Sequence, residues 1–377
     1  MESLGMRPAR KFIQDQRGAS MIMVAVSMFV ILSFAVLAID MSLIQLAKNQ
    51  LQNAADAAAL SAAVKYGISN HDQVAATNEA IRIAGLNRAI QTTQQAVTIT
   101  EADVSFPAAS RVRVQTHRTV STNNPVQLYF MRILSANNDN HGNMRASATA
   151  QLTPIGATNC LKPWVFPDRW NDTDGDSIWD PGEVYDPITT GYRVPEDVGK
   201  VITLKYNTGG STTKTGWYQP VKFGPVNRGG PNCSGADCYR TFISQCEPYM
   251  VAIGDTMEFE MGNMVGPTRQ GWSNLIALDP NAYFNTATGT IENSAYAVSP
   301  RMIKIALFDP TVGVITSGIT GAAKYTVIAK LAFLFIESPP TGGNDVAVMA
   351  RFMQYTSAGE PCPDCPEGFL FTARLVK

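Results

Sequence analysis

The feature that most constrains this chain is an uncharged apolar run close to its N-terminus. Residues Ala19 to Ile39 read ASMIMVAVSMFVILSFAVLAI and contain no charged side chain in 21 positions. A helix rises about 1.5 Å per residue, so a helix of this length is about 30 Å long, which matches the hydrocarbon core of a bilayer. The run therefore predicts one transmembrane helix over residues 19–39.

The charges on either side of the span predict its orientation. Asp40 is the first charge after the span, whereas the leader, residues 1–18, carries four crowded basic side chains: Arg7, Arg10, Lys11 and Arg17. Short basic segments stay on the cytoplasmic side of a membrane. We therefore expect a cytoplasmic leader, with the rest of the chain outside the cytoplasm.

A cleaved secretion signal is the alternative, because a basic start, an apolar core and the small Ala38 fit that pattern. The run is longer than the usual signal core of about 7 to 15 residues, and no A-x-A cleavage site closes it. Both features favour a helix that is retained.

The helical pattern continues past the span, because no Gly or Pro occurs between Asp40 and Gly67. We expect a stalk helix over residues 40–67 with a narrow stripe of small or apolar side chains: Ile44, Ala47, Leu51, Ala54 and Ala58. Small residues allow another helix to approach closely, so the stripe is compatible with helix–helix self-association. Packing against the chain's own next domain is the interpretation that we favour.

Leader, span and stalk together resemble a known bacterial family. QRGAS before the apolar run, Asp40 at its end and LQNAADAAALSAA after it are similar to the N-terminal part of TadG-like proteins of the TadE/TadG family. The resemblance implies an accessory component of the Tad machinery, which builds Flp-type type IV pili at the bacterial inner membrane. Its partners would be that membrane and Tad pilus-assembly proteins or pilins, and its exported domains would face the periplasm or the cell surface.

The N-terminus departs from the pilins of that system in one respect. Those pilins are cut after a Gly and carry Glu five residues on, but here Gly18 is followed at that place by Met23. We therefore expect an anchor that is not processed.

Residues 68–155 predict a small α+β module, in which a helix covers a small antiparallel sheet. The apolar spacing predicts helices within 71–90 and 126–134, and strands over 96–106, 111–120 and 144–152.

Gly and Pro become frequent after Pro154 and Gly156, which predicts a boundary and a mainly β domain over residues 156–377. We expect a sandwich or a mixed sheet, with residues 325–336 as a central strand because they are apolar on both faces. Further strands are expected at 198–206, 216–223, 249–253, 302–308 and 346–355, and one helix within 266–280. The whole chain is thus of the α+β class.

Six cysteines lie beyond the span: Cys160, Cys233, Cys238, Cys246, Cys362 and Cys365. In an exported protein an even number indicates disulfides, although the pairing is not readable from sequence. Zinc is the alternative, since the 233/238 and 362/365 pairs have ligand-like spacing.

One acidic stretch, DTDGDSIWDPGE, matches the calcium loop of EF-hand proteins, which takes oxygen ligands from positions 1, 3, 5, 7, 9 and 12. Those positions are Asp172, Asp174, Asp176, the Ile178 carbonyl, Asp180 and Glu183. Ser177 replaces the usual Gly at position 6, and nearby prolines disfavour paired EF helices. We predict an isolated structural calcium site; a solvated acidic turn is the alternative.

Nothing in the sequence indicates catalysis. The three histidines, His71, His117 and His141, have no metal-ligand spacing, and the net charge of −1 with no basic cluster beyond the leader disfavours a nucleic-acid partner. We predict a non-enzymatic protein without a small-molecule substrate that acts through its surfaces. A calcium-stabilised adhesin on the same anchor is the second hypothesis.

Overall fold

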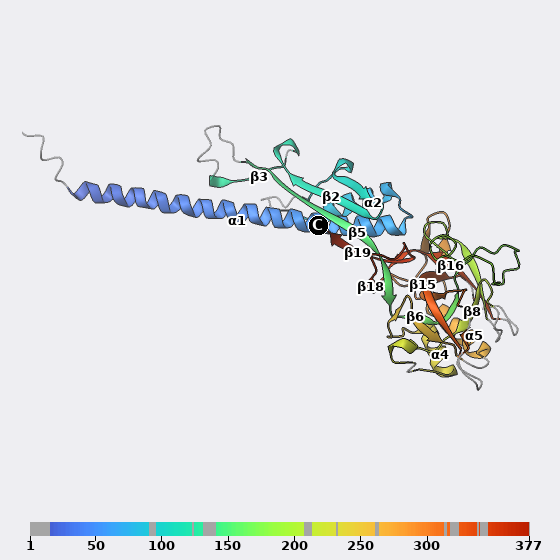
Figure 1. The fold of residues 1–377 in the computed structure, drawn as a ribbon. Helices are drawn as coiled ribbons and strands as arrows, with labels where there is room; N and C mark the ends of the chain where they lie inside the picture. The colour runs from blue at the N-terminus through green and yellow to red at the C-terminus, as the bar shows by residue number, and fades with distance from the viewer. Residues whose placement is uncertain are drawn as a thin grey trace, which may run out of the picture. The chain divides into compact units, whose positions relative to one another are not determined.

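The structure, a computed structural model, describes residues 16–89, 96–122, 124–130, 141–206, 213–230, 233–260, 264–312, 315–316, 324–337, 339 and 346–376. The fold is mixed, with a long N-terminal helix and a β-rich C-terminal region (Figure 1). The chain divides into two compact units, which share several elements. The first unit comprises Met1–Ala59, Ala80–Ser105 and Arg113–Thr149, and the second comprises Leu60–Glu79, Phe106–Val112 and Ala150–Lys377.

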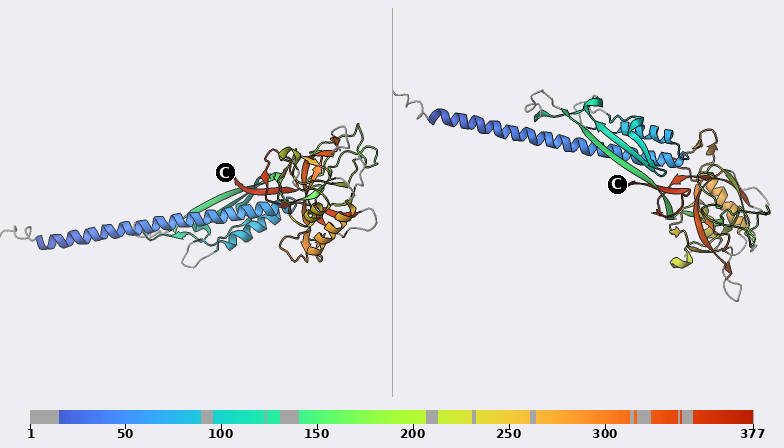
Figure 2. Two further views of the ribbon diagram at one scale, coloured as in Figure 1. Left: turned by 90° about the horizontal axis from the view of Figure 1, so that it is seen from below. Right: turned by 45° about the horizontal axis from the view of Figure 1, so that its top comes forward.

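Helix α1, Gln16–Ile68, joins the predicted span and the predicted stalk without a break (Figures 1 and 2). It contains no Pro, and its two glycines lie near its ends, so nothing interrupts the backbone hydrogen bonds. Helix α2, Gln73–Leu86, follows after a short turn. Asp72 caps α2, because its Oδ1 accepts the N–H groups of Val74 at 2.8 Å and Ala75 at 3.1 Å.

Strands β1 (Val104–Ala108), β2 (Arg111–Arg118) and β5 (Met144–Thr158) lie next to one another in one sheet. Alternate residues of β2 are buried, which is the period of a strand with one covered face. The predicted strand over 96–106 is wrong over most of its length, because β1 begins only at Val104 after the short helix η2, Glu101–Asp103.

The predicted helix over 126–134 is wrong at its start. Val126 and Gln127 form strand β3, which pairs with β4, His141–Gly142. Partners 14 and 16 positions away in sequence thus override the local helical pattern, and residues 131–134 lie outside the described part of the chain.

Strand β5 continues past the predicted end at residue 152, so Pro154 and Gly156 lie inside a strand rather than between elements. The Pro154 carbonyl accepts the Cys362 N–H at 2.8 Å, and the Gly156 carbonyl accepts the Ile253 N–H at 2.8 Å. A proline lacks only the N–H, so it remains compatible with a strand that uses its carbonyl.

The β-rich part of the second unit is a mixed sheet that closes on itself, a closure that the sequence analysis did not predict. Strand β15, Lys324–Ile336, pairs with both β13 and β16 and closes a six-stranded barrel, which confirms its central position. The barrel order is β15, β13 (Met302–Phe308), β6 (Leu161–Pro167), β8 (Trp217–Pro220), β7 (Val201–Tyr206) and β16 (Ala347–Met353).

Two helices pack on this barrel, α4 (Ala236–Ser244) and α5 (Val265–Leu278), of which α5 was predicted. Trp272 of α5 stacks on Trp164 of β6 with ring centroids 4.6 Å apart, and both side chains are fully buried. Such aromatic contacts fix the helix on the barrel core.

The remaining described elements are two or three residues long, apart from the seven-residue strand β19. They are β9 (Val251–Ala252), β10 (Thr256–Glu258), β11 (Tyr283–Asn285), β12 (Thr290–Glu292), β14 (Ile315–Thr316), β17 (Tyr355–Thr356), β18 (Glu360–Pro361), β19 (Leu370–Val376), η3 (Val120–Thr122) and η4 (Val226–Arg228).

Candidate functional site

The acidic stretch forms a loop that is tied at its base and along one side. Asn171 and Val184 make an antiparallel bridge, with the Asn171 N–H donating to the Val184 carbonyl at 3.0 Å. Trp179 donates its N–H to the Thr213 carbonyl at 3.0 Å, and its ring lies edge-on to Trp170. The loop is therefore held at its base by its own two ends and along one side by the chain near Thr213.

The Asp172 carboxylate organises the interior of this loop. Its Oδ1 accepts the Gly175 N–H at 2.7 Å and its Oδ2 accepts the Ser177 N–H at 2.9 Å. Ser177 has φ of 63°, the left-handed conformation that an EF-hand loop normally assigns to Gly at this position. Ser177 therefore keeps the left-handed backbone at this position, although it replaces the usual Gly.

Three of the predicted ligands converge. One carboxylate oxygen each from Asp172, Asp174 and Asp176 lies within 4.8 Å of the others, which is the spacing of oxygens that surround one ion at about 2.3–2.6 Å. Partial desolvation and the charges of Asp176, Asp174 and Glu183 raise the pKa of Asp180, so these acidic groups repel one another.

Two of the three remaining predicted ligands, the Ile178 carbonyl and Glu183, have defined hydrogen-bonding surroundings. The hydrogen bonds of the bridge between Ile178 and Lys214 come from residues 177 and 179, which leaves the Ile178 carbonyl out of the bridge. Glu183 spans the loop, because its carboxylate accepts the N–H groups of Thr173 at 3.0 Å and Asp180 at 3.1 Å. The structure brings together the carboxylates of Asp172, Asp174 and Asp176, and a divalent cation is the group whose charge and oxygen preference fit these three.

The first part of α1 is exposed as a membrane span would be. From Ser20 onward, the most apolar 18-residue window has a mean hydropathy of 2.8 and no buried residue. Phe29 and Phe34 are 66% and 68% exposed. Helix length and composition make this segment a candidate membrane span.

Asp40, the first charge after the span, is buried with only 3% of its surface exposed. Its Oδ1 accepts the Tyr129 N–H at 2.7 Å and its Oδ2 accepts the Phe130 N–H at 2.5 Å. Sequence reasoning missed this role. The available signal was a lone carboxylate directly after an apolar span, where an unpartnered charge is costly.

The small-residue stripe of the stalk is covered by the chain itself. Ala47 packs against Val126 and Leu128, and the Leu51 carbonyl accepts the Thr116 hydroxyl at 2.9 Å. Ala54 and Ala58 are fully buried as well. The structure thus shows the packing that we favoured, and the stripe is not available to a second copy while this packing holds.

Comparison with known proteins bears on this helix. The family model described as a putative Flp pilus-assembly TadE/G-like domain matches residues 18–65. Residues 18–65 form a TadE/G-like segment. The match confirms the resemblance carried by QRGAS, Asp40 and LQNAADAAALSAA, and it supports a role in Flp/Tad pilus assembly. No curated protein and no solved structure matches the chain significantly.

Beyond the TadE/G-like segment the cysteines pair as disulfides. Cys160 joins Cys246, Cys233 joins Cys238, and Cys362 joins Cys365, with Cα–Cα separations of 4.4, 6.0 and 5.3 Å. The first bridge links residues 86 positions apart, whereas the other two close short loops. The two pairs with ligand-like spacing are thus local disulfides in this structure.

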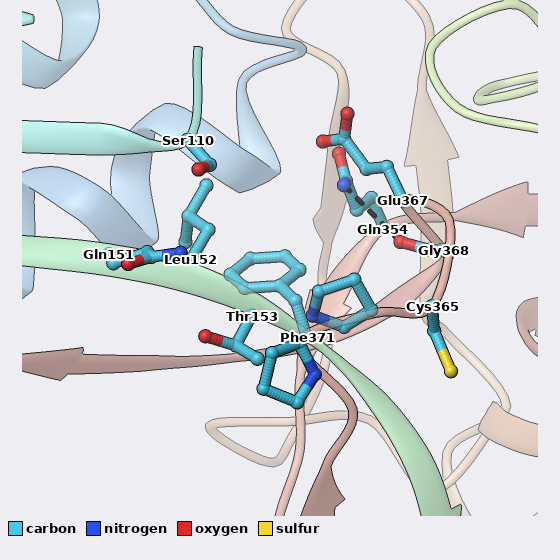
Figure 3. A pocket seen from close by; sticks show the side chains of 11 residues that line it. Ser110, Gln151, Leu152, Thr153, Gln354, Cys365, Glu367, Gly368 and Phe371 are labelled. Carbon is cyan, nitrogen blue, oxygen red and sulfur yellow. Dashed lines mark hydrogen bonds between the residues drawn. The ribbon is translucent and has the colours of Figure 1, made fainter. Parts of the chain in front are cut away.

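A small polar cavity of about 200 Å³ lies in the second unit (Figure 3). His71, which follows the TadE/G-like segment, contacts one of its lining residues. Glu367 lines this cavity and accepts from His71 Nε2 at 2.8 Å. This hydrogen bond raises the pKa of His71, partly offset by burial. Glu367 is the one ionisable side chain among the lining residues, so the cavity carries no acid–base pair of its own.

Proposed function

We propose that this protein is a non-enzymatic, single-pass inner-membrane component of a Flp/Tad pilus-assembly or secretion machine. Its leader faces the cytoplasm and its folded domains face the periplasm or the cell surface. It acts through contacts between those domains and pilus-assembly proteins or pilins.

One observation carries the proposal. A single helix, matched by the TadE/G-like family model over residues 18–65, combines an exposed apolar first half with a second half that is covered by the chain's own sheet. A helix that is hydrophobic and exposed over about 20 residues needs a lipid environment, whereas its continuation needs none. The basic leader supports the orientation.

The test is piliation of a strain that lacks the gene. We expect Flp pili, counted by electron microscopy, to be lost and to return with the full-length chain. A chain in which residues 19–39 are replaced by an unrelated transmembrane sequence should also restore them, if the exported domains make the contacts. Normal piliation in the deletion strain would contradict the proposal and favour the adhesin.

Orientation has its own test, which is protease accessibility. In spheroplasts, added protease should digest the chain beyond Asp40 and spare the leader, detected with an N-terminal epitope tag. A leader that is digested from outside would reverse the proposed topology.

The acidic loop adds a structural calcium ion to the proposal, held by Asp172, Asp174, Asp176, the Ile178 carbonyl, Asp180 and Glu183. Support comes from the converging carboxylates and from the backbone conformation at Ser177. Calorimetry of the purified protein should show a heat of calcium binding, and chelator should lower its melting temperature. Identical melting with calcium and with chelator would remove the ion from the account.

A further inference from the structure

The segment 126–130 runs along α1 at the first turns beyond the span. Val126 and Leu128 are 3% and 5% exposed and pack against Ala47, with Ile44 beside them. Figures 1 and 2 show the β3 end of this segment lying against α1, on the N-terminal side of β2 and β5. The segment therefore reaches the part of α1 that directly follows the span.

Asp40 fixes how close to the span the segment reaches. The Tyr129 and Phe130 N–H groups lie 2.7 and 2.5 Å from its carboxylate oxygens. When residues 20–39 cross a hydrocarbon core about 30 Å thick, Asp40 stands at the boundary between acyl chains and headgroups. Both backbone N–H groups must then lie at that boundary too.

Several large apolar side chains at this level are at least partly exposed. Tyr129 is 56% exposed and Phe130 is half-buried, while Ile39 and Met41 of α1 are 51% and 53% exposed. A single exposed tyrosine on a soluble surface needs no explanation, but here its position is tied to the end of a membrane span. Tyrosine, with an apolar ring and a polar hydroxyl, is favoured at the membrane–water interface.

We propose that Tyr129 and Phe130 rest in the headgroup region of the bilayer that α1 crosses, so that the exported part contacts phospholipid directly beside its anchor. This inference rests on the proposed function, because it requires α1 to span the membrane. Its consequence is mechanical. A second contact beside the helix restrains the tilt of α1, since the module cannot tilt away without withdrawing both aromatic rings from the interface.

Fluorescence quenching by lipid tests the proposal. The native tryptophans all lie in the second unit, at positions 164, 170, 179, 217 and 272, so one added tryptophan is measured by difference from the wild type. Tyr129→Trp in full-length protein, reconstituted into phosphatidylcholine/phosphatidylglycerol vesicles, should be quenched by phospholipid that carries a nitroxide near the glycerol. Phe130→Trp provides a second reporter of the same boundary.

Leu86→Trp is the matched control. Leu86 is 67% exposed and ends α2, which runs back along α1 because Ser61 donates to Glu79 at 2.8 Å. Leu86 consequently lies about 20 Å farther along the helix axis than Asp40. We expect little quenching of this tryptophan.

The outcomes separate the two proposals. Protein that floats with the vesicles, with the tryptophan at 129 quenched and that at 86 unquenched, supports the inference. Floating protein in which positions 129 and 130 are quenched no more than position 86 overturns the inference and leaves the anchor intact. Protein that does not float with vesicles overturns the anchor, and the inference with it.

Discussion

Asp40 connects parts of the chain that are far apart in sequence. It holds two N–H groups that are 89 and 90 residues away, while it sits one residue after the apolar span. Hydrogen bonds to a charged acceptor contribute about 1.5–3 kcal/mol each. A carboxylate at this position thus couples the end of the span to the module that covers the stalk.

Replacing Asp40 by Ala should release this coupling. We expect faster amide hydrogen exchange at Tyr129 and Phe130 in the Asp40→Ala protein, corresponding to a local loss of roughly 2 kcal/mol, because both N–H groups lose their acceptor. Asp56→Ala is the control, since Asp56 is half-buried on the same helix and accepts from Gln52. Unchanged protection at 129 and 130 would show that the carboxylate does not hold them.

His71 gives the molecule a small pH dependence. In the folded protein, the hydrogen bond to Glu367 raises the pKa of His71 above its ordinary value of 6.5. The ion pair therefore stabilises the folded state fully below pH 6.5, and this stabilisation is lost as the pH rises through the raised pKa. Since 45% of the Glu367 side chain is exposed, the effect should stay below about 1 kcal/mol. Between pH 6 and 8, the melting temperature of the wild type should fall relative to Glu367→Gln. Parallel curves would contradict this account.

Among the elements, the acidic loop provides the sharpest test of metal binding. Added calcium should raise the melting temperature of the wild type. When calcium is at 100 times its dissociation constant, the free energy of unfolding should rise by about 2.7 kcal/mol. Asp172→Asn should lose this calcium dependence. Asp237→Asn, which changes an exposed side chain of α4, should keep the calcium dependence of the melting temperature. Equal responses of the two variants would place the ion elsewhere.

Helix α5 contains a matched pair of glycines. A Cβ on Gly271 would stand 2.8 Å from the Ile243 Cβ of α4, whereas a Cβ on Gly266 meets nothing within 4 Å. Gly271→Ala should therefore destabilise the protein by about 1–3 kcal/mol through overpacking. Gly266→Ala should be neutral or stabilise by up to about 1 kcal/mol, because Ala is the better helix former. Thermal unfolding of both variants measures the difference, and equal effects would contradict the close packing of α4 on α5.

Local pattern predicted those elements whose apolar residues repeat without interruption. Helix α1, helix α5 and strand β15 belong to this group. Strand β6 was missed because Pro163, Pro167 and Lys162 interrupt its pattern, although all seven of its residues are buried. Helix α4 was missed because it is only nine residues long. An element whose apolar pattern is interrupted, or too short to be recognised, is not predicted from local sequence even where tertiary contacts stabilise it.

At the scale of the whole molecule, contacts between residues far apart in the chain could not be predicted from local sequence patterns. Closure of the barrel depends on β15 pairing with β16, and the Asp40 contact depends on residues 89 positions away. The convergence of the three aspartates in the acidic loop and the apolar span could be predicted, because both features are contiguous in sequence. The account of function depends mainly on that second contiguous feature, the span.

The central claim is that residues 19–39 remain in the mature protein and hold it in the membrane. Alkaline carbonate extraction of cell membranes, followed by intact-mass measurement of the protein, tests this claim most directly. The account predicts that the protein stays in the membrane pellet with a mass that includes the whole apolar run. A protein in the soluble fraction, or a mature chain that begins after Ile39, would contradict it.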